Sequence, residues 1–341
     1  MDDTLFGGED TCFENSNLDS VDFSYKNFKG FSFKKTILFE ANLQGAIFED
    51  ANLTGANLYC ANLQNANLKN ANLTDCSLYK ANLTGANLSG VYLNNTNLRY
   101  ANLTDANLTK ADLTNANLQG AILTNTILTK AILYKCILSG ATLDYAYCRY
   151  ADLREANLNK TSMNSTNFEN AILNNASIQN SKCNKVDFKD AQMIKVNFNF
   201  STLTEANFIN TNLQHAELNN CNLTKAQFIY TDLTHTKIQN STMVQSQLVF
   251  ANLTETDLTN TNLSHSNLIN AKLVNTILIS ADLSNAILTS STIYEIYPRF
   301  ANFTNAKLVD TLIDISDFSD SIMKNVKITG ATINDCEFPV L

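Results

Sequence analysis

The 341-residue chain carries a net charge of −8, from 24 basic and 32 acidic side chains, and it has no Trp, 2 Pro and 10 Gly. This charge disfavours direct binding to nucleic acid or anionic lipid, so neither is expected as a partner. No apolar run approaches the ~20 residues that cross a bilayer, so no membrane span is expected. Eight Cys without a secretory signal predict reduced thiols in a cytoplasmic protein.

The chain begins with residues 1–10, which we interpret as a separate N-terminal acidic segment. From Thr11 to Val340 the sequence then runs in quintets without insertion or deletion, as in Ala51-Asn52-Leu53-Thr54-Gly55. Position 1 is almost always small, and position 3 is almost always Leu, Phe, Ile or Met.

A five-residue period does not fit a helix, in which a residue every five positions visits all sides. In an extended segment, positions 1 and 3 point to the same side. The chain must turn after each quintet to restore the phase. The sequence therefore predicts a coil of short strands, with positions 1 and 3 inside and positions 2, 4 and 5 facing water.

The A(N/D)LXX quintets resemble those of the pentapeptide-repeat family, which is in large part bacterial. The resemblance implies an all-β fold: a right-handed quadrilateral parallel β-helix with four quintets per coil, so that residues 20 apart stack. The quintets over 11–341 then form a single β-helix of about 16 coils.

Three regions depart from the pattern. Quintets at about 11–35 place Lys26 and Phe31 at small positions and are predicted to be irregular or capping. Around Cys148, which takes a core position, either a local bulge or a tolerated small core residue is expected. Quintets at about 296–341 begin with Pro298, which cannot donate to a ladder and predicts a bulge or bend before a terminal cap.

Two outward-facing stripes are the candidate partner-binding residues. In the first, Phe39, Tyr59, Tyr79 and Arg99 occupy position 4 at 20-residue intervals. The second lies half a coil away in the register and has six members: Ile209, Ile229, Tyr230, Val249, Phe250 and Ile269. Exposed apolar area and Arg are typical of interfaces. The alternative is that like side chains pack across strands only to stabilise the surface.

No catalytic residue, cofactor site or metal site is predicted. The three His lie at the outward position 5, and the column Lys195, His215, His235 and Glu255 is interpreted as alternating surface charge. Ligands on successive coils of a flat face span roughly 10 Å, too far to converge on one ion.

The leading hypothesis is a non-catalytic scaffold that presents flat β faces of a rigid rod to an unidentified protein partner. A homodimer through a coil end or an apolar stripe is a second form of the same idea. The alternative, implied by the family resemblance, is a DNA-mimicking regulator of DNA gyrase or topoisomerase of the quinolone-protection type.

Overall fold

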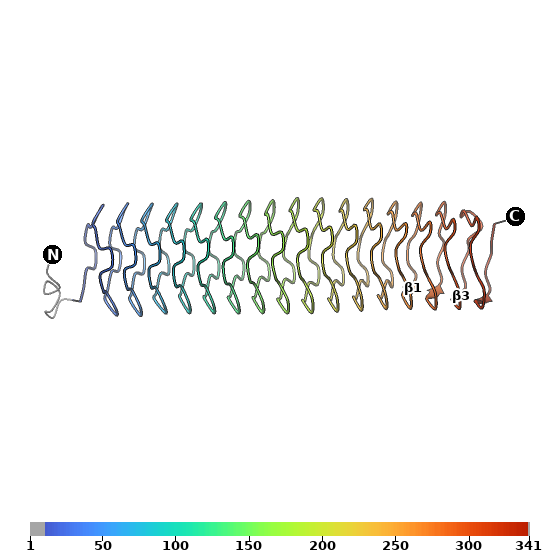
Figure 1. Ribbon diagram of the computed structural model, residues 1–341, viewed down its shortest axis with the longest axis horizontal. Coiled ribbons are helices and arrows are strands. Elements are labelled where there is room, and N and C mark those ends of the chain that lie inside the picture. Colours follow the sequence, from blue (N-terminus) through green and yellow to red (C-terminus); the bar gives the residue numbers. More distant parts are fainter. Residues whose placement is uncertain (1–10, 340–341) are drawn as a thin grey trace. The chain divides into compact units, whose positions relative to one another are not determined.

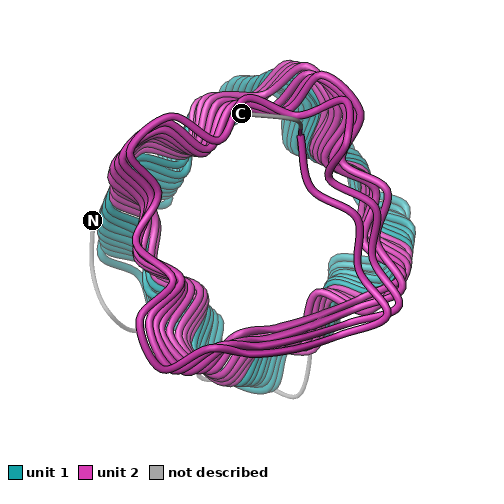
Figure 2. Cartoon of the chain, turned by 90° about the vertical axis from the view of Figure 1, so that its right-hand side faces the viewer, with its two compact units in different colours: residues 1–167 teal, residues 168–341 magenta. Residues whose placement is uncertain are grey.

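The computed structural model describes residues 11–339, and the acidic segment 1–10 and residues 340–341 lie outside this range. The chain divides into two compact units, residues 1–167 and 168–341. Within each unit the chain winds in successive turns that lie one behind another (Figures 1 and 2). No helix in residues 11–339 has the length and apolar content that crossing a bilayer requires.

The turns pair in parallel at intervals of 20 residues. Bridges such as Asn52 with Asn72 and Asn212 with Asp232 connect position 2 of one turn with position 2 of the next, within each unit. Four strands of three residues form a parallel sheet in the second unit: β1 (Lys272–Val274), β2 (Thr292–Tyr294), β3 (Leu312–Asp314) and β4 (Thr332–Asn334). Each unit therefore has four quintets per turn, as predicted.

Each quintet satisfies its backbone N–H groups in one repeated way. In the quintet of Leu53, Asn52 donates to Phe31 on the preceding turn, whereas Leu53 and Gly55 donate to Asn72 and Thr74 on the following turn. The next N–H, that of Ala56, closes a tight turn on the carbonyl of Leu53. This pattern leaves only position 4 without a backbone acceptor.

Where position 2 is Asn or Asp, its side chain commonly supplies the missing acceptor; in other quintets an Asn or Asp at position 4 of the preceding turn does so, as Asn174 accepts from the N–H of Ile194 at 2.9 Å. The N–H of Thr54 donates to Oδ1 of Asn52 at 3.1 Å, and that of Thr114 donates to Oδ1 of Asp112 at 3.0 Å. Asn and Asp combine this reach with an acceptor oxygen and form this bond more strongly than Ser or Thr, which explains their frequency at position 2. Asn side chains also bond along the stack, as Asn82 donates to Asn62 and Asn62 to Asn42, both at 3.2 Å.

The reversal of the chain falls at position 5. Every residue with positive φ among the described residues stands at this position, and the non-glycine values run from 44° to 64°. This is the third residue of an i to i+3 turn, as in a type II turn, where Gly and Asn are favoured. The frequent Asn, Gly and Asp at position 5 follow from this geometry.

The interior of each unit consists of positions 1 and 3. Ala51 and Leu53 are 1% and 0% exposed, and the same two positions are buried in nearly every quintet. Thr and Ser at position 1 remain compatible with burial because the hydroxyl reaches back one turn, as Thr96 donates to the carbonyl of Leu73 at 2.8 Å. Stacking of such columns buries apolar area continuously.

The three regions that depart from the sequence pattern differ in how far their backbone departs from the regular repeat. Quintets 11–35 keep the regular turns, so their irregularity lies in the side chains, with the rings of Phe13 and Phe33 stacked 4.9 Å apart. Cys148 is fully buried in a regular quintet, so it is a tolerated core residue and not a bulge.

At Pro298 the pairing is disturbed, as the sequence predicts. Within the described residues, Tyr297 forms no β-bridge. The backbone N–H of Phe300 donates to the carbonyl of Asp320, 20 residues later, whereas the N–H at position 5 of other quintets donates to a carbonyl 19 residues later. Farther on, Ile328 and Ile333 are 45% and 39% exposed although they occupy core positions.

Candidate functional site

The first stripe is a stack of aromatic rings in the first unit. Phe39 and Tyr59 are parallel within 15° at 5.3 Å between ring centroids, and Tyr59 and Tyr79 within 12° at 5.1 Å. The guanidinium of Arg99 lies 5.9 Å from the Tyr79 ring. The structure thus brings together all four predicted residues on one face, half-buried and in a single row.

Two neighbours of this stripe, Lys80 and Tyr100, were not predicted from the sequence. Tyr100 packs edge-on against Tyr79 at 5.6 Å and lies 5.6 Å from the Arg99 guanidinium, and Lys80 lies 5.5 Å from the centroid of the Tyr79 ring. Both occupy position 5 next to the stripe. The 20-residue spacing of Lys80, Tyr100 and Gly120 is the signal that would have found them.

The second stripe forms an apolar patch in the second unit, made of Ile209, Ile229, Tyr230, Val249, Phe250 and Ile269. Tyr230 donates its N–H to the carbonyl of Val249, and Phe250 to that of Ile269, so these quintets lie on consecutive turns. The rings of Tyr230 and Phe250 stack at 4.9 Å and 5°. They are 59% and 47% exposed, so their outer edges remain in water.

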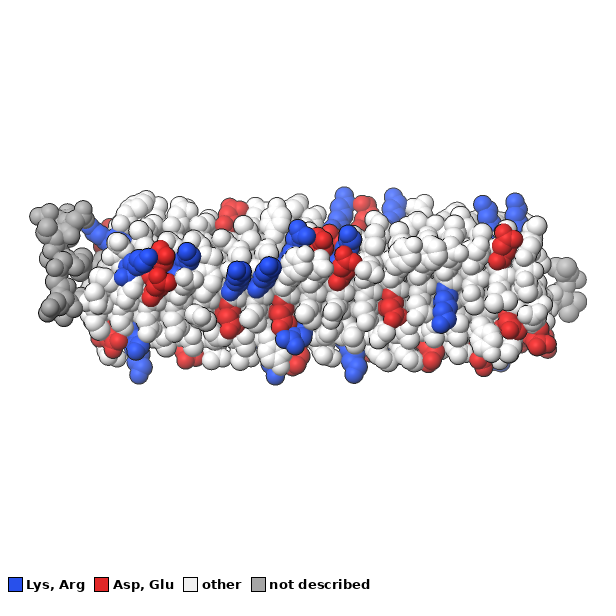
Figure 3. Space-filling model, turned by 90° about the horizontal axis from the view of Figure 1, so that it is seen from below, with Lys and Arg blue, Asp and Glu red and all other residues white. Residues whose placement is uncertain are grey.

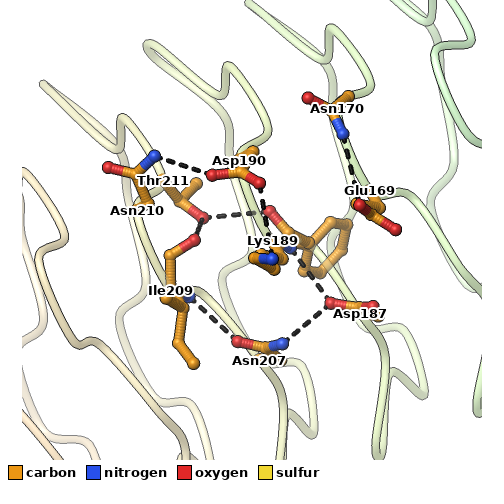
Figure 4. A network of polar contacts seen from close by, with 10 residues as sticks. Glu169, Asn170, Asp187, Lys189, Asp190, Asn207, Ile209, Asn210 and Thr211 are labelled. Atoms are coloured by element: carbon orange, nitrogen blue, oxygen red, sulfur yellow. Dashed lines mark hydrogen bonds and ion pairs between the residues drawn. The ribbon is translucent and has the colours of Figure 1, made fainter.

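Polar groups border this apolar patch. At one end, Asn207 donates to Asp187 at 2.9 Å and accepts from the N–H of Ile209 at 3.0 Å, and Asn210 donates to Asp190 at 2.7 Å (Figure 4). Along one side, Asn267 donates to Gln247 at 3.2 Å. An apolar centre with a polar rim is the usual composition of a protein interface.

Part of the apolar patch lies over an aromatic core column. Position 3 is Phe208 in the quintet of Ile209 and Phe228 in that of Tyr230, and it is Phe188 one turn earlier. Phe188 and Phe208 stack at 5.3 Å, and Phe208 and Phe228 at 4.9 Å, all fully buried. The next two quintets of the patch have Leu248 and Leu268 at this position. The patch is therefore supported by large side chains whose rotamers are fixed by packing.

The His column follows the predicted order. The imidazoles of His215 and His235 are stacked at 4.8 Å, and Nδ1 of His235 lies 3.0 Å from Oε2 of Glu255. In residues 11–339 no three His, Cys, Asp or Glu side chains are grouped so that they could hold a metal ion. Ion pairs elsewhere, such as Lys237 with Glu217 at 3.8 Å, are exposed and contribute little to stability.

The repeat, the parallel pairing and the helix-free interior define a solenoid built from five-residue units. The family model of pentapeptide repeats matches the chain over residues 36–75, 76–115, 106–144, 136–175, 171–208, 203–240 and 246–291. The chain belongs to the pentapeptide-repeat family, whose members are in general non-catalytic structural repeat proteins.

Solved structures similar to this chain include QnrB1 and the pentapeptide repeat protein HetL. QnrB1, a plasmid-mediated fluoroquinolone resistance protein, is 21% identical over 47% of this chain and 81% of its own, with a TM-score of 0.44. HetL, involved in heterocyst differentiation regulation in the cyanobacterium Nostoc, is 25% identical over 78% of this chain and 92% of its own, with a TM-score of 0.22. A search of the curated proteins gave no match.

Proposed function

We propose that this protein is a non-catalytic scaffold that captures a protein partner on flat β faces. The observation that carries the proposal is the apolar patch of the second unit, where stacked rings at Tyr230 and Phe250 adjoin a row of aliphatic side chains. Exposed apolar area of this kind is unfavourable in water unless a partner covers it. The amide rim supplies hydrogen bonds that surround such a contact.

The interior of the repeat supports the same role. Positions 1 and 3 fill the core, whereas the side chains at positions 4 and 5 vary without loss of core packing, position 5 being limited only by its positive φ. A face of this solenoid is therefore a surface on which recognition residues are placed at 20-residue intervals and about 4.8 Å spacing. In repeat proteins such surfaces serve as binding faces.

The test is capture of partners from the native lysate by immobilised protein, with wild type compared to the double variant Ile229→Lys and Val249→Lys. A Lys pair in the patch centre places two charges where the contact must be desolvated. The matched control is Thr224→Lys with Thr234→Lys, at position 4 on other faces. We expect proteins retained by wild type and by the control to be lost by the patch variant, with unchanged far-UV circular dichroism.

Light scattering of the same three proteins identifies self-association. If the patch variant alone changes the oligomeric state, the partner is a second copy of this chain. Equal capture and equal oligomeric state for all three would contradict the proposal.

The alternative function, regulation of DNA gyrase by DNA mimicry, needs a continuous acidic surface. Lysine, arginine, aspartate and glutamate are interspersed on the face that Figure 3 shows. In the first unit, the stack of quintets that holds Tyr59, Tyr79 and Arg99 carries three charged residues from 56–60 to 156–160, namely Lys80, Arg99 and Lys160, and no acidic residue over these quintets. We therefore place this function second. A supercoiling assay with purified gyrase tests it, and inhibition or quinolone protection would reverse the order.

A further inference from the structure

A cationic stretch lies on one face of the first unit and is called the cationic face below. It consists of six quintets that stack at 20-residue intervals, 56–60, 76–80, 96–100, 116–120, 136–140 and 156–160. The two quintets before them in the same stack, 16–20 and 36–40, carry Asp19 and Glu40. The cationic face has three charged residues, Lys80, Arg99 and Lys160, and none forms an ion pair with a residue that the structure describes. Elsewhere Lys often has a carboxylate nearby, as Lys69 has Glu49 at 3.9 Å. This cationic face therefore leaves its positive charge uncompensated.

A hollow of about 340 Å³, bordered by residues with polar side chains, opens on the cationic face. The hollow lies beside Gly140, which occupies position 5 and has no side chain to fill it. No atom lies within 4 Å of the place where a Cβ of Gly140 would stand, and φ there is +71°. At Gly120 the ring of Tyr100 fills that place, 2.6 Å from the ideal Cβ. The lining residues are Gln119, Ser139, Gly140, Asn157, Asn159 and Lys160.

Three hydrogen-bond donors of the hollow are uncommitted. The Gln119 amide, the Ser139 hydroxyl and the Lys160 ammonium make no side-chain hydrogen bond or ion pair with any described residue. Within residues 11–339 these donors have no acceptor, two of them lie beside the Lys160 ammonium, and no carboxylate lines the hollow. Such a set of groups suits a ligand that carries a negatively charged oxygen.

We propose that the cationic face binds an acidic peptide segment in extended conformation, with one carboxylate in the hollow at Lys160 and another at Arg99. This proposal rests on the scaffold function and names the partner chemistry for the face that holds Arg99. The quintets of Arg99 and Lys160 are three turns apart, roughly 14 Å at ~4.8 Å per turn. Four residues of an extended peptide span about the same length, and side chains at i and i+4 point to the same side. The matching ligand therefore has acidic residues at i and i+4.

The density of charge favours a peptide over a nucleic acid. Lys80 and Lys160 are four turns apart, so three cations cover about 19 Å. Duplex DNA carries one phosphate charge per ~1.7 Å of axis, and binding depends on many phosphate contacts. Two or three well-separated cations, with amide and hydroxyl donors between them, match the spacing of individual carboxylates along a peptide better than the dense phosphates of a nucleic acid.

The experiment measures fluorescence anisotropy of a labelled Ser/Gly peptide with Glu at i and i+4, titrated with the full chain. Three further probes are a peptide with Gln at both positions, a peptide with Glu at i and i+3, and a single-stranded oligonucleotide. We expect the i, i+4 acidic peptide to bind roughly tenfold more tightly than the Gln peptide, and added salt to weaken it. The i+3 peptide is expected to bind more weakly because its second carboxylate points away.

Two variants locate the site. Lys160→Gln removes the cation, and Gly140→Asn fills the hollow at a position where Asn adopts the positive φ readily. Each is expected to weaken binding roughly tenfold. The matched controls are Gly30→Asn, with the same φ of +71° and equally open surroundings, and Lys307→Gln, an exposed Lys of the second unit. Neither control is expected to change binding.

Equal binding of the Glu and Gln peptides, or equal loss in Gly140→Asn and Gly30→Asn, would overturn the proposal. So would oligonucleotide binding that is as tight as peptide binding and equally sensitive to Lys160→Gln. The variant Ile229→Lys with Val249→Lys is expected to keep peptide binding. The two proposals can therefore fail separately. If lysate capture does not depend on the apolar patch but the acidic peptide binds, only the scaffold function fails. If lysate capture depends on the patch but the acidic peptide does not bind, only this inference fails.

Discussion

The amide of Asn62 donates to Oδ1 of Asn42, 20 residues earlier, at 3.2 Å. The Oδ1 of Asn62 also accepts from the backbone N–H of Gln64 at 3.2 Å and from the amide of Asn82 at 3.2 Å. The Asn62 side chain thus satisfies the backbone N–H at position 4 of its own quintet and also connects three successive turns through side-chain hydrogen bonds. Because the repeat leaves the N–H of position 4 without a backbone acceptor, this side chain is part of the fold and not only its surface.

The first prediction concerns this amide. Asn62→Ala removes the acceptor for the Gln64 N–H and both stacking bonds, and we expect the free energy of unfolding in urea to fall by about 1–3 kcal/mol. Asn62→Asp keeps an acceptor and is expected to lose less. If Ala and Asp destabilise equally, the bond to the backbone contributes nothing.

Buried hydroxyls at position 1 allow a matched comparison. The Ser266 hydroxyl is buried without a hydrogen-bond partner in the described part of the chain, whereas that of Ser241 donates to the carbonyl of Leu218 at 2.8 Å. We expect Ser266→Ala to stabilise by up to about 1 kcal/mol and Ser241→Ala to destabilise by about 1–3 kcal/mol. Thermal unfolding of the two variants checks this, and a shift of the same sign in both would refute it.

Ile315 has a φ of 47°, which is unfavourable for a β-branched residue. Replacement by Asn, which adopts this conformation more readily, is expected to stabilise by about 1 kcal/mol. The reverse change at Asn275, in the same column with a φ of 52°, is expected to destabilise by a similar amount. Urea unfolding measures both, and opposite signs are required.

Asp232 predicts a pH dependence. Burial raises its pKa, but hydrogen bonds from Thr234, Gln214 and Asn252 outweigh burial and lower the pKa below its ordinary value. The ionised form is thus favoured in the folded state, so the carboxylate stabilises above the unfolded-state pKa of about 3.9, and this contribution is lost as pH falls through the lowered folded pKa.

The matching variant is Asp232→Asn, measured by urea unfolding across a pH series. We expect it to be less stable than wild type at pH 7, and the difference to shrink as pH falls below about 4. A difference that is constant with pH would show that the charge of Asp232 does not stabilise the fold.

Most of the fold could be predicted from the sequence, because small residues at position 1 and large apolar residues at position 3 recur without a break. The stacking of Asn52 on Asn72 and the burial of Leu53 confirm that register. The role of position 2 could be predicted only in part. Stacking of amides follows from the 20-residue interval, but the bond to the N–H of position 4 depends on a turn geometry that spacing alone does not reveal.

The surface was predicted less completely. The stacking of Phe39, Tyr59 and Tyr79 follows from their common position, and so does that of Tyr230 and Phe250. The hollow at Gly140 was missed because a cavity is produced by absent side chains, and a search for apolar or charged stripes passes over glycine. Whether a partner covers either stripe depends on a second molecule, which the sequence of one chain does not describe.

Photo-crosslinking tests the scaffold account most directly. A benzophenone side chain is placed at Phe250 in the apolar patch or at Phe200, a 58% exposed ring on another face of the same unit, and each protein is irradiated in the native lysate. The account predicts a discrete crosslinked product for Phe250 that is missing for Phe200 and is abolished by Ile229→Lys. The same products from both positions, or none from Phe250, would contradict the claim that this face binds a partner.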